Sequence, residues 1–255
     1  MSCYPKVILF GDSQTQTSFS SHGNVNSWGA SLSHKLSRKC DVMNRGFAGY
    51  NTHMAKQILP ELITKDISCE VAVLVIFFGS NDAIFEECSP KQHVPIDDYK
   101  LNLKEMAQYL LTVSVLREKI ILVTPPPIDD EKWEKECKAK GKPVDRKNSV
   151  NGDYSKACFA AAKDYGIDVL DLWTLMQKEK NWRTFLSDGV HLSPEGDQFL
   201  FKSIAEKIET RTDSTAMKYP YFRDIVSVSP HKREQFILDN QYIHPEDSKL
   251  NCSIL

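Results

Sequence analysis

The chain has 255 residues, of which 41% are hydrophobic and 26% are charged. This composition is typical of a globular protein with a large apolar core, and it excludes an extensively disordered chain. The 32 basic and 34 acidic residues nearly cancel to a net charge of -2, so we expect no surface for nucleic acid or anionic membranes. The partner that this composition favours is a small molecule.

The cysteine pattern indicates a reducing compartment. Seven cysteines are scattered along the chain without a Cys-x-x-Cys pair, and an odd number cannot be fully bridged within one chain. The longest apolar run, residues 71–78, is too short to span a bilayer, and the first residues lack the apolar core of a signal peptide. We therefore expect a cytoplasmic protein without stable membrane insertion.

The last four residues, Cys252-Ser-Ile-Leu255, have the form of a prenylation signal, and a terminal leucine is typical of geranylgeranyl attachment. Stable anchoring needs a second signal such as a polybasic segment. The preceding residues instead include Glu246 and Asp247. We interpret the match as coincidental.

Short apolar runs alternate with segments of helical periodicity along most of the chain. This alternation predicts right-handed βαβ crossovers, and therefore an α/β protein with one parallel five-stranded sheet between two layers of helices. Ser193 and Pro194 are a typical cap and first residue for the last of these helices. The expected strands are residues 6–10, 41–44, 71–78, 119–124 and 167–172, and the expected helices are residues 28–37, 53–63, 97–111, 149–164 and 194–208.

Two stretches fall outside this repeat. We expect residues 1–211 to form one domain and residues 212–255 to form a tail that packs on the domain or on a partner, for example in a homodimer. Residues 128–148 are rich in charge and are expected to form a loop with a short helix. This loop begins at the carboxyl edge of the sheet, where it could shape the wall of a pocket.

Polar turns follow the first three expected strands. They are GDSQT at residues 11–15, RGFAGY at residues 45–50 and GSND at residues 79–82. The carboxyl ends of parallel strands share one edge of the sheet, and ligands bind at that edge. We therefore expect these three turns to meet there, with the hydroxyl of Ser13 at the end of the first strand.

Ester hydrolysis requires a nucleophile, a base, a group that orients the base, and donors for the developing oxyanion. Asp188 and His191 lie three residues apart, so one tight turn can bring the carboxylate to the imidazole. The carboxylate would fix the tautomer of His191 and leave the second ring nitrogen free to accept the proton of Ser13.

The blocks GDSQT, GSND and DGVHLSPEG, in this order and spacing, resemble the SGNH hydrolases, also called GDSL-type esterases and lipases, over residues 6–208. The runs CDVMNRGFAGYNT, SPKQHVPIDDY, DVLDLWTLMQ and LSDGVHLSPEG are similar to the isoamyl acetate-hydrolysing esterase subfamily. The resemblance implies a three-layer α/β/α, flavodoxin-like fold and no cofactor. It makes Ser13 the nucleophile, Asp188 and His191 the rest of the triad, and Ser13, Gly49 and Asn81 the oxyanion donors.

The chain departs from the family pattern at Gln14, since the family more often has an apolar residue after the serine. We expect Gln14 to alter the wall beside the nucleophile without touching the triad.

GDSQT also lacks the second glycine of Gly-x-Ser-x-Gly, which argues against the nucleophile elbow of an α/β-hydrolase. Asp12 and Asp82 are expected to accept hydrogen bonds from loop N–H groups rather than to react.

Each motif alone is also ordinary turn chemistry, and it is their conjunction at the strand ends that favours catalysis. We predict a serine esterase that hydrolyses small, acetate-type esters through an acyl-serine intermediate. Three alternatives stay open: a sugar deacetylase, a lysophospholipase or thioesterase with the same residues, and a non-catalytic flavodoxin-like binding module. The remaining histidines lack zinc-site spacing, so no metal is expected.

Overall fold

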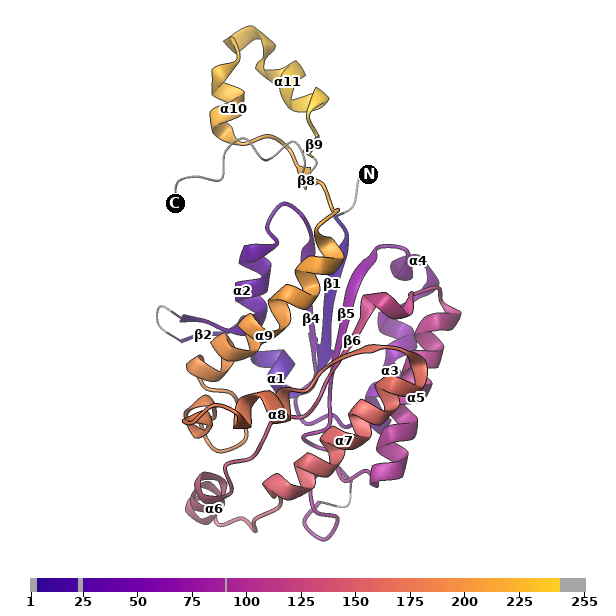
Figure 1. Ribbon diagram of the computed structural model, residues 1–255, viewed down its shortest axis with the longest axis vertical. Helices are drawn as coiled ribbons and strands as arrows, with labels where there is room; N and C mark the ends of the chain where they lie inside the picture. Colours follow the sequence, from indigo (N-terminus) through magenta and orange to yellow (C-terminus); the bar gives the residue numbers. More distant parts are fainter. Residues whose placement is uncertain (1–3, 23–24, 90, 244–255) are drawn as a thin grey trace.

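A parallel sheet of five strands forms the centre of the computed structural model, which describes residues 4–22, 25–89 and 91–243 (Figure 1). The expected α/β fold with a five-stranded parallel sheet is confirmed. The strand order is β4-β1-β5-β6-β7. The strands are β1 (Lys6–Gly11), β4 (Asp41–Gly46), β5 (Val71–Phe77), β6 (Ile120–Val123) and β7 (Asp168–Leu170).

Strand β1 lies in the interior of the sheet, and its side chains are buried on both faces. Successive side chains of a strand point to opposite sides, so they enter two separate cores. Val7 and Leu9 belong to one apolar core, and Ile8 and Phe10 belong to the other. A nearly continuous apolar run is therefore the pattern that an interior strand of a covered parallel sheet requires.

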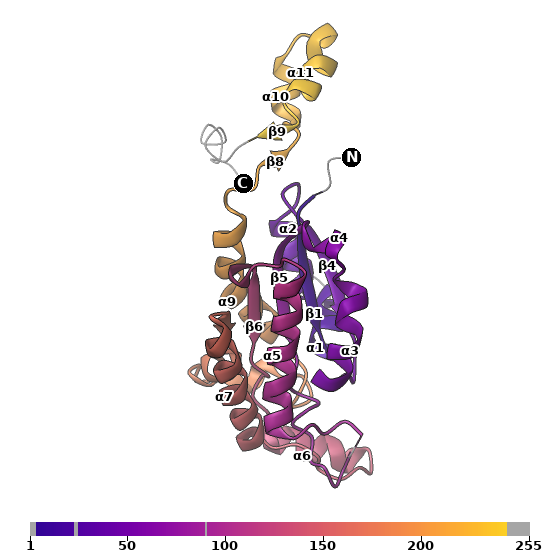
Figure 2. The same cartoon turned by 90° about the vertical axis from the view of Figure 1, so that its right-hand side faces the viewer.

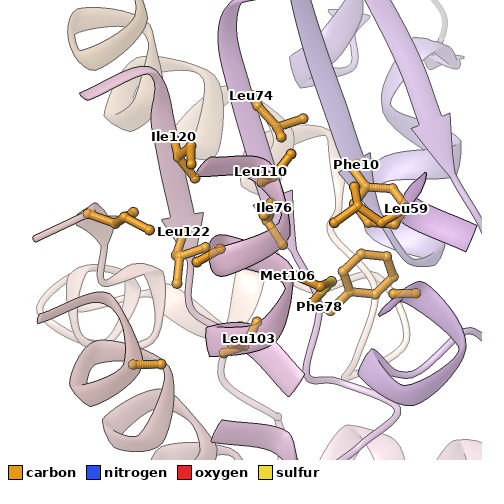
Figure 3. Close-up of a cluster of buried hydrophobic side chains, with 14 of the residues drawn as sticks. Phe10, Leu59, Leu74, Ile76, Phe78, Leu103, Met106, Leu110, Ile120 and Leu122 are labelled. Atoms are coloured by element: carbon orange, nitrogen blue, oxygen red, sulfur yellow. The ribbon is translucent and has the colours of Figure 1, made fainter. Parts of the chain in front are cut away.

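Helices cover both faces of the sheet (Figures 1 and 2). Figure 3 shows the core beneath α5, where Leu103, Met106 and Leu110 meet side chains of β5 and β6. One face is covered by α3 (Thr52–Leu62), α5 (Ile96–Thr112) and α7 (Asn148–Tyr165), and the other by α2 (Trp28–Lys35), α8 (Leu172–Gln177) and α9 (Pro194–Thr212).

The ends of two elements show how capping decides a boundary. The hydroxyl of Ser193 accepts the N–H of Gly196, and Pro194 begins α9, as expected. The expected strand at 167–172 was too long, because it stops at Leu170. The carboxylate of Asp171 accepts the N–H of Thr174 and starts α8, which overrides the apolar run.

Several shorter elements lie outside the two helical layers. At the carboxyl edge, α1 (Ser13–Gln16) follows β1, and α6 (Asp130–Ala139) is the short helix expected within residues 128–148. The others are α4 (Lys65–Ser68) and the hairpin of β2 (Ser21–His22) with β3 (Val25–Asn26).

After α9 the chain forms an arm beyond the amino ends of the strands, at the opposite end of the sheet from α1 (Figure 1). The guanidinium of Arg38 donates to the carbonyls of Lys218 and Tyr219 and lies 4.4 Å from the ring centroid of Tyr221. The predicted tail boundary at residue 212 and the predicted homodimer stay predictions, and the prenylation motif at Cys252 lies outside the described residues. The arm contains β8 (Met217–Lys218), α10 (Phe222–Ser227), α11 (Arg233–Asp239) and β9 (Tyr242–Ile243).

The cysteines of the described segments carry free thiols, namely Cys40, Cys69, Cys88, Cys137 and Cys158. Burial raises the pKa of the Cys40 thiol to about 11 and that of Cys158 to about 12. Since the thiolate is the reactive form, these two buried cysteines are poor nucleophiles. Within the same segments no helix combines the length and the apolar character needed to cross a bilayer.

Replacing Leu74 with alanine tests the core between β5 and α5. Leu74 is fully buried, so Leu74→Ala should lower the free energy of unfolding by about 2 to 5 kcal/mol through lost burial and a residual cavity. Urea denaturation followed by circular dichroism measures this change.

The matched control is Leu101→Ala on α5, where the side chain is 50% exposed. This substitution should change the free energy of unfolding by less than about 0.5 kcal/mol. Equal losses in the two variants would contradict the assigned packing.

Candidate active site

Ser13 is the first residue of α1, directly after β1. The carboxylate of Asp12 caps this short helix by accepting the N–H of Gln14 at 3.0 Å. The chain turns so sharply that a Cβ at Gly11 would lie 2.1 Å from Oγ1 of Thr15. Glycine at position 11 therefore allows α1 to fold back against the strand, which leaves Ser13 at the carboxyl edge of the sheet.

A continuous hydrogen-bonded chain joins Ser13, His191 and Asp188. Nε2 of His191 lies 3.1 Å from Oγ of Ser13, and Nδ1 of His191 lies 2.7 Å from Oδ2 of Asp188. The structure thus brings together the three residues predicted from the sequence. In this geometry, Nδ1 donates to the carboxylate and Nε2 faces the serine hydroxyl.

The turn that carries His191 is held by its own acidic residue. Oδ1 of Asp188 accepts the backbone N–H groups of Val190 at 2.9 Å and His191 at 2.8 Å. Burial by itself raises the pKa of the Asp188 carboxyl, but the bonds from the His191 side chain and from these backbone groups outweigh burial and hold the pKa well below its usual value. Asp188 is therefore a carboxylate at neutral pH.

Helix α6 packs closely against this turn. Gly189 has φ +98°, and a Cβ there would lie 2.6 Å from the backbone nitrogen of Trp133. The N–H of Asp129 donates to the carbonyl of Gly189, and Nζ of Lys132 donates to the carbonyl of Leu186. Residues 128–148, which we expected to shape a pocket wall, therefore support the segment that carries Asp188 and His191.

Gly49 and Asn81 lie in the loops that follow β4 and β5, the two strands that flank β1. Gly49 has φ +82°, a conformation that glycine adopts without strain. Nδ2 of Asn81 donates to the carbonyl of Tyr50 at 2.9 Å, which ties the two loops together and leaves a second amide hydrogen for another acceptor. Nε2 of Gln92 donates to the carbonyl of Gly49 and fixes the orientation of that peptide.

Two buried carboxyl groups lie beneath these loops and bond backbone donors, as expected for Asp12 and Asp82. Oδ1 of Asp82 accepts from both the N–H and the hydroxyl of Thr52. Burial raises the pKa of Asp12 to about 6 and that of Asp82 to about 7. Across the described ranges, no group of three or more His, Cys, Asp or Glu side chains is arranged to hold a metal ion.

Arg146 also contributes to this edge of the sheet, a role that was not predicted from the sequence. Its guanidinium donates to the carbonyl of Ser80 and, at 3.4 Å, to Oδ1 of Asn81. These contacts turn the amide oxygen of Asn81 toward Arg146 and its nitrogen toward the Gly49 loop. The sequence offers no signal for this role, because a single arginine in a charged segment is most often solvated.

The expectation that Gln14 alters the wall beside Ser13 was wrong. The side chain is only 2% exposed, so it does not form a wall beside the nucleophile. Its amide group bonds the backbone of Val190 and Leu192, the two neighbours of His191. Gln14 therefore bonds the segment that carries His191, although neither of its partners is itself one of the three predicted catalytic residues.

A family model described as GDSL-like lipase/acylhydrolase matches residues 7–204. The chain belongs to this family. Among its relatives is the mouse protein named isoamyl acetate-hydrolyzing esterase 1 homolog, which is 51% identical over 89% of this chain and 90% of the mouse chain. A GDSL esterase/lipase of Arabidopsis thaliana is 40% identical over 89% of this chain and 96% of its own. The chain is therefore a carboxylic ester hydrolase by family, as predicted.

Solved structures share the fold. A lipase/acylhydrolase from Enterococcus faecalis superposes with a TM-score of 0.65 at 23% identity, covering 81% of this chain and 96% of the bacterial chain. A variant of an acetyl-xylooligosaccharide esterase from Geobacillus gives a TM-score of 0.61 at 19% identity, with coverages of 82% and 95%. At these identities the likeness concerns the fold, which agrees with the expected α/β/α layers of a GDSL-type hydrolase.

The raised pKa of Asp82 predicts a pH-dependent cost in stability. In the unfolded chain the carboxyl ionises near the ordinary aspartate pKa of 3.8, whereas the folded chain keeps the proton up to about pH 7. The folded state therefore binds more protons in this window, and stability falls as pH rises through it. Asp82→Asn removes this titration, so wild type should lose a few kcal/mol more than the variant between about pH 4 and pH 7.

Urea denaturation at a series of pH values measures the difference. Asp188, whose lowered pKa gives the opposite slope, is present in both proteins and cancels from the comparison. Parallel curves for wild type and Asp82→Asn would show that Asp82 ionises alike in the folded and unfolded chains.

Proposed function

We propose that the chain is a serine esterase that hydrolyses small, short-chain carboxylic esters of the acetate type through an acyl-serine intermediate. The observation that carries this proposal is the hydrogen-bonded chain from Asp188 through His191 to Ser13. A serine that only capped or turned the chain would need no imidazole at 3.1 Å, and an imidazole in a structural role would need no carboxylate on its other nitrogen.

Acylation begins when Oγ of Ser13 attacks the ester carbonyl. Nε2 of His191 accepts the hydroxyl proton, and the Asp188 carboxylate stabilises the imidazolium that forms. The negative charge moves to the former carbonyl oxygen, where the N–H of Ser13, the N–H of Gly49 and the amide of Asn81 would donate hydrogen bonds. Collapse of this intermediate breaks the bond to the alcohol, which leaves with the proton from His191.

Deacylation repeats these steps with water. His191 accepts a proton from the water molecule as it attacks the acyl carbonyl, and the same donors stabilise the second oxyanion. Breakage of the ester bond to Ser13 then releases the carboxylic acid and returns the proton to the serine oxygen. The cycle uses only groups of this chain and water.

The acetate preference rests on the name of the mouse relative, at 51% identity, and of the human relative, at 49%. Deacetylation of a sugar and cleavage of a lysophospholipid or thioester would use the same catalytic groups. A panel of p-nitrophenyl esters with acyl chains of increasing length, together with acetylated sugars, distinguishes these reactions.

The free thiols of the described cysteines support the predicted reducing, cytoplasmic location.

Removal of the Ser13 hydroxyl should abolish catalysis. Ser13→Ala is expected to reduce the hydrolysis of p-nitrophenyl acetate to the uncatalysed rate and to abolish labelling by a fluorophosphonate probe, since both reactions need Oγ as the nucleophile. Ser203→Ala on α9 is the matched control, because the Ser203 hydroxyl bonds the carbonyl of Phe199 within its own helix. Full turnover by a folded Ser13→Ala protein would refute the proposal.

The amide of Asn81 tests the oxyanion hole. Asn81→Ala should lower kcat for p-nitrophenyl acetate by about 10²- to 10³-fold with a much smaller change in KM, because the donor acts mainly in the transition state. Asn240→Ala in the arm removes a similar amide-to-carbonyl bond, to Phe236, and should leave kcat unchanged. If the two variants keep equal kcat values, Asn81 has no part in oxyanion binding.

A further inference from the structure

Gln14 forms a direct link between the nucleophile and the segment that carries His191. It follows Ser13 in α1, and its side chain is 2% exposed. Nε2 donates to the carbonyl of Val190 at 2.8 Å, and Oε1 accepts the N–H of Leu192 at 3.1 Å. The two bonds therefore hold the main chain on both sides of the histidine.

The bonds of the His191 turn to Asp188 and to α6 do not link it to α1, the helix that begins with Ser13. The bonds from Asp188 to Val190 and His191 lie within the turn, so they fix the ring relative to its own backbone. The contacts with α6 hold the turn to a different part of the molecule. The amide of Gln14, the residue next to Ser13, connects the turn to α1.

The backbone of Gln14 is held as firmly as its side chain. Nε1 of Trp28, a fully buried side chain, donates to the carbonyl of Gln14 at 3.0 Å, and the N–H of Gln14 bonds the Asp12 carboxylate. The link to Val190 and Leu192 thus starts from a fixed point. An apolar side chain at position 14 would fill the space but leave a buried carbonyl and an N–H without their partner.

We propose that Gln14 is a positioning residue that sets the distance between Ser13 and His191 by holding the peptide groups on both sides of the histidine. The inference rests on the proposed serine mechanism, because the position of His191 matters only if its imidazole accepts the serine proton. Gln14 is buried, so we assign it no contact with the substrate. It acts through the placement of the base.

The test is Gln14→Met, which keeps the length of the side chain and removes both hydrogen-bonding groups. Because a misplacement of about 1 Å can cost about 10²-fold in rate, kcat for p-nitrophenyl acetate should fall by about 10- to 100-fold, with KM changed less than about 3-fold. The rate of fluorophosphonate labelling at Ser13 should fall by a similar factor. Gln14→Leu provides a second apolar variant with the same expected result.

The matched control is Gln198→Met. Nε2 of Gln198 also bridges separate elements, donating to the carbonyl of Asn26 at 2.8 Å and to Oγ of Ser31 at 3.3 Å, and both of these partners lie outside the triad. This variant should keep the kcat of wild type. Thermal unfolding of all variants shows whether the assays are made on folded protein.

Proton NMR separates displacement of the turn from its unfolding. The downfield signal of the His191 Nδ1 proton should persist in Gln14→Met, because the bond to Asp188 lies within the turn.

Wild-type kcat in a folded Gln14→Met or Gln14→Leu protein would overturn the inference and leave the serine mechanism intact. Activity of Ser13→Ala would overturn the mechanism itself, so the two failures are distinguishable.

Discussion

The parallel pairing of β1 with both β4 and β5 is the constraint on which the site depends. The register places Gly11 beside Gly46 on one side and beside Phe77 on the other, so the three strands end at one level. Ser13, Gly49 and Asn81 follow these ends within a few residues. A slip of one residue would move a loop by about 3.3 Å, which exceeds the tolerance of a hydrogen bond. The apolar side chains that fix the register therefore also fix the spacing of the proposed oxyanion donors.

The carboxyl edge carries buried ionisable groups, which lower the stability of the fold. Asp12 and Asp82 are buried at this edge and Arg146 is largely buried. Burial raises the pKa of the two carboxyl groups and lowers that of the guanidinium, so it favours the neutral form of each group. Two of them bond a loop that carries a proposed catalytic group: Asp12 bonds the turn after Ser13, and Arg146 bonds Asn81. Enzymes commonly retain such destabilising groups where they hold a site in its working geometry. Asp12 and Arg146 thus lie where they hold the loops of the proposed site.

The sequence was sufficient for features that depend on local pattern. The apolar runs of β1 and β5, the cap at Ser193 and the spacing of Asp188 and His191 each carry a signal within a few residues. Contacts between distant segments carry none. Arg146 and Gln14 look like ordinary polar residues until folding places them beside Asn81 and His191. The expected strand at 167–172 was too long for a related reason, because the cap at Asp171 lies inside an apolar run.

The separation of Ser13 and His191 is fixed by two routes that both pass through Gln14. Its side chain holds the backbone beside His191, and its carbonyl accepts from Trp28. The backbone N–H of Trp28 in turn contacts the carboxylate of Asp197 at 3.5 Å, in the first turn of α9, the helix that begins just after the His191 turn. Ser13 and His191 are therefore connected through buried contacts of α2 and α9 rather than through an exposed loop. Such a connection holds the two groups at hydrogen-bonding distance before any substrate arrives, so the proposed acylation would require little rearrangement of the protein.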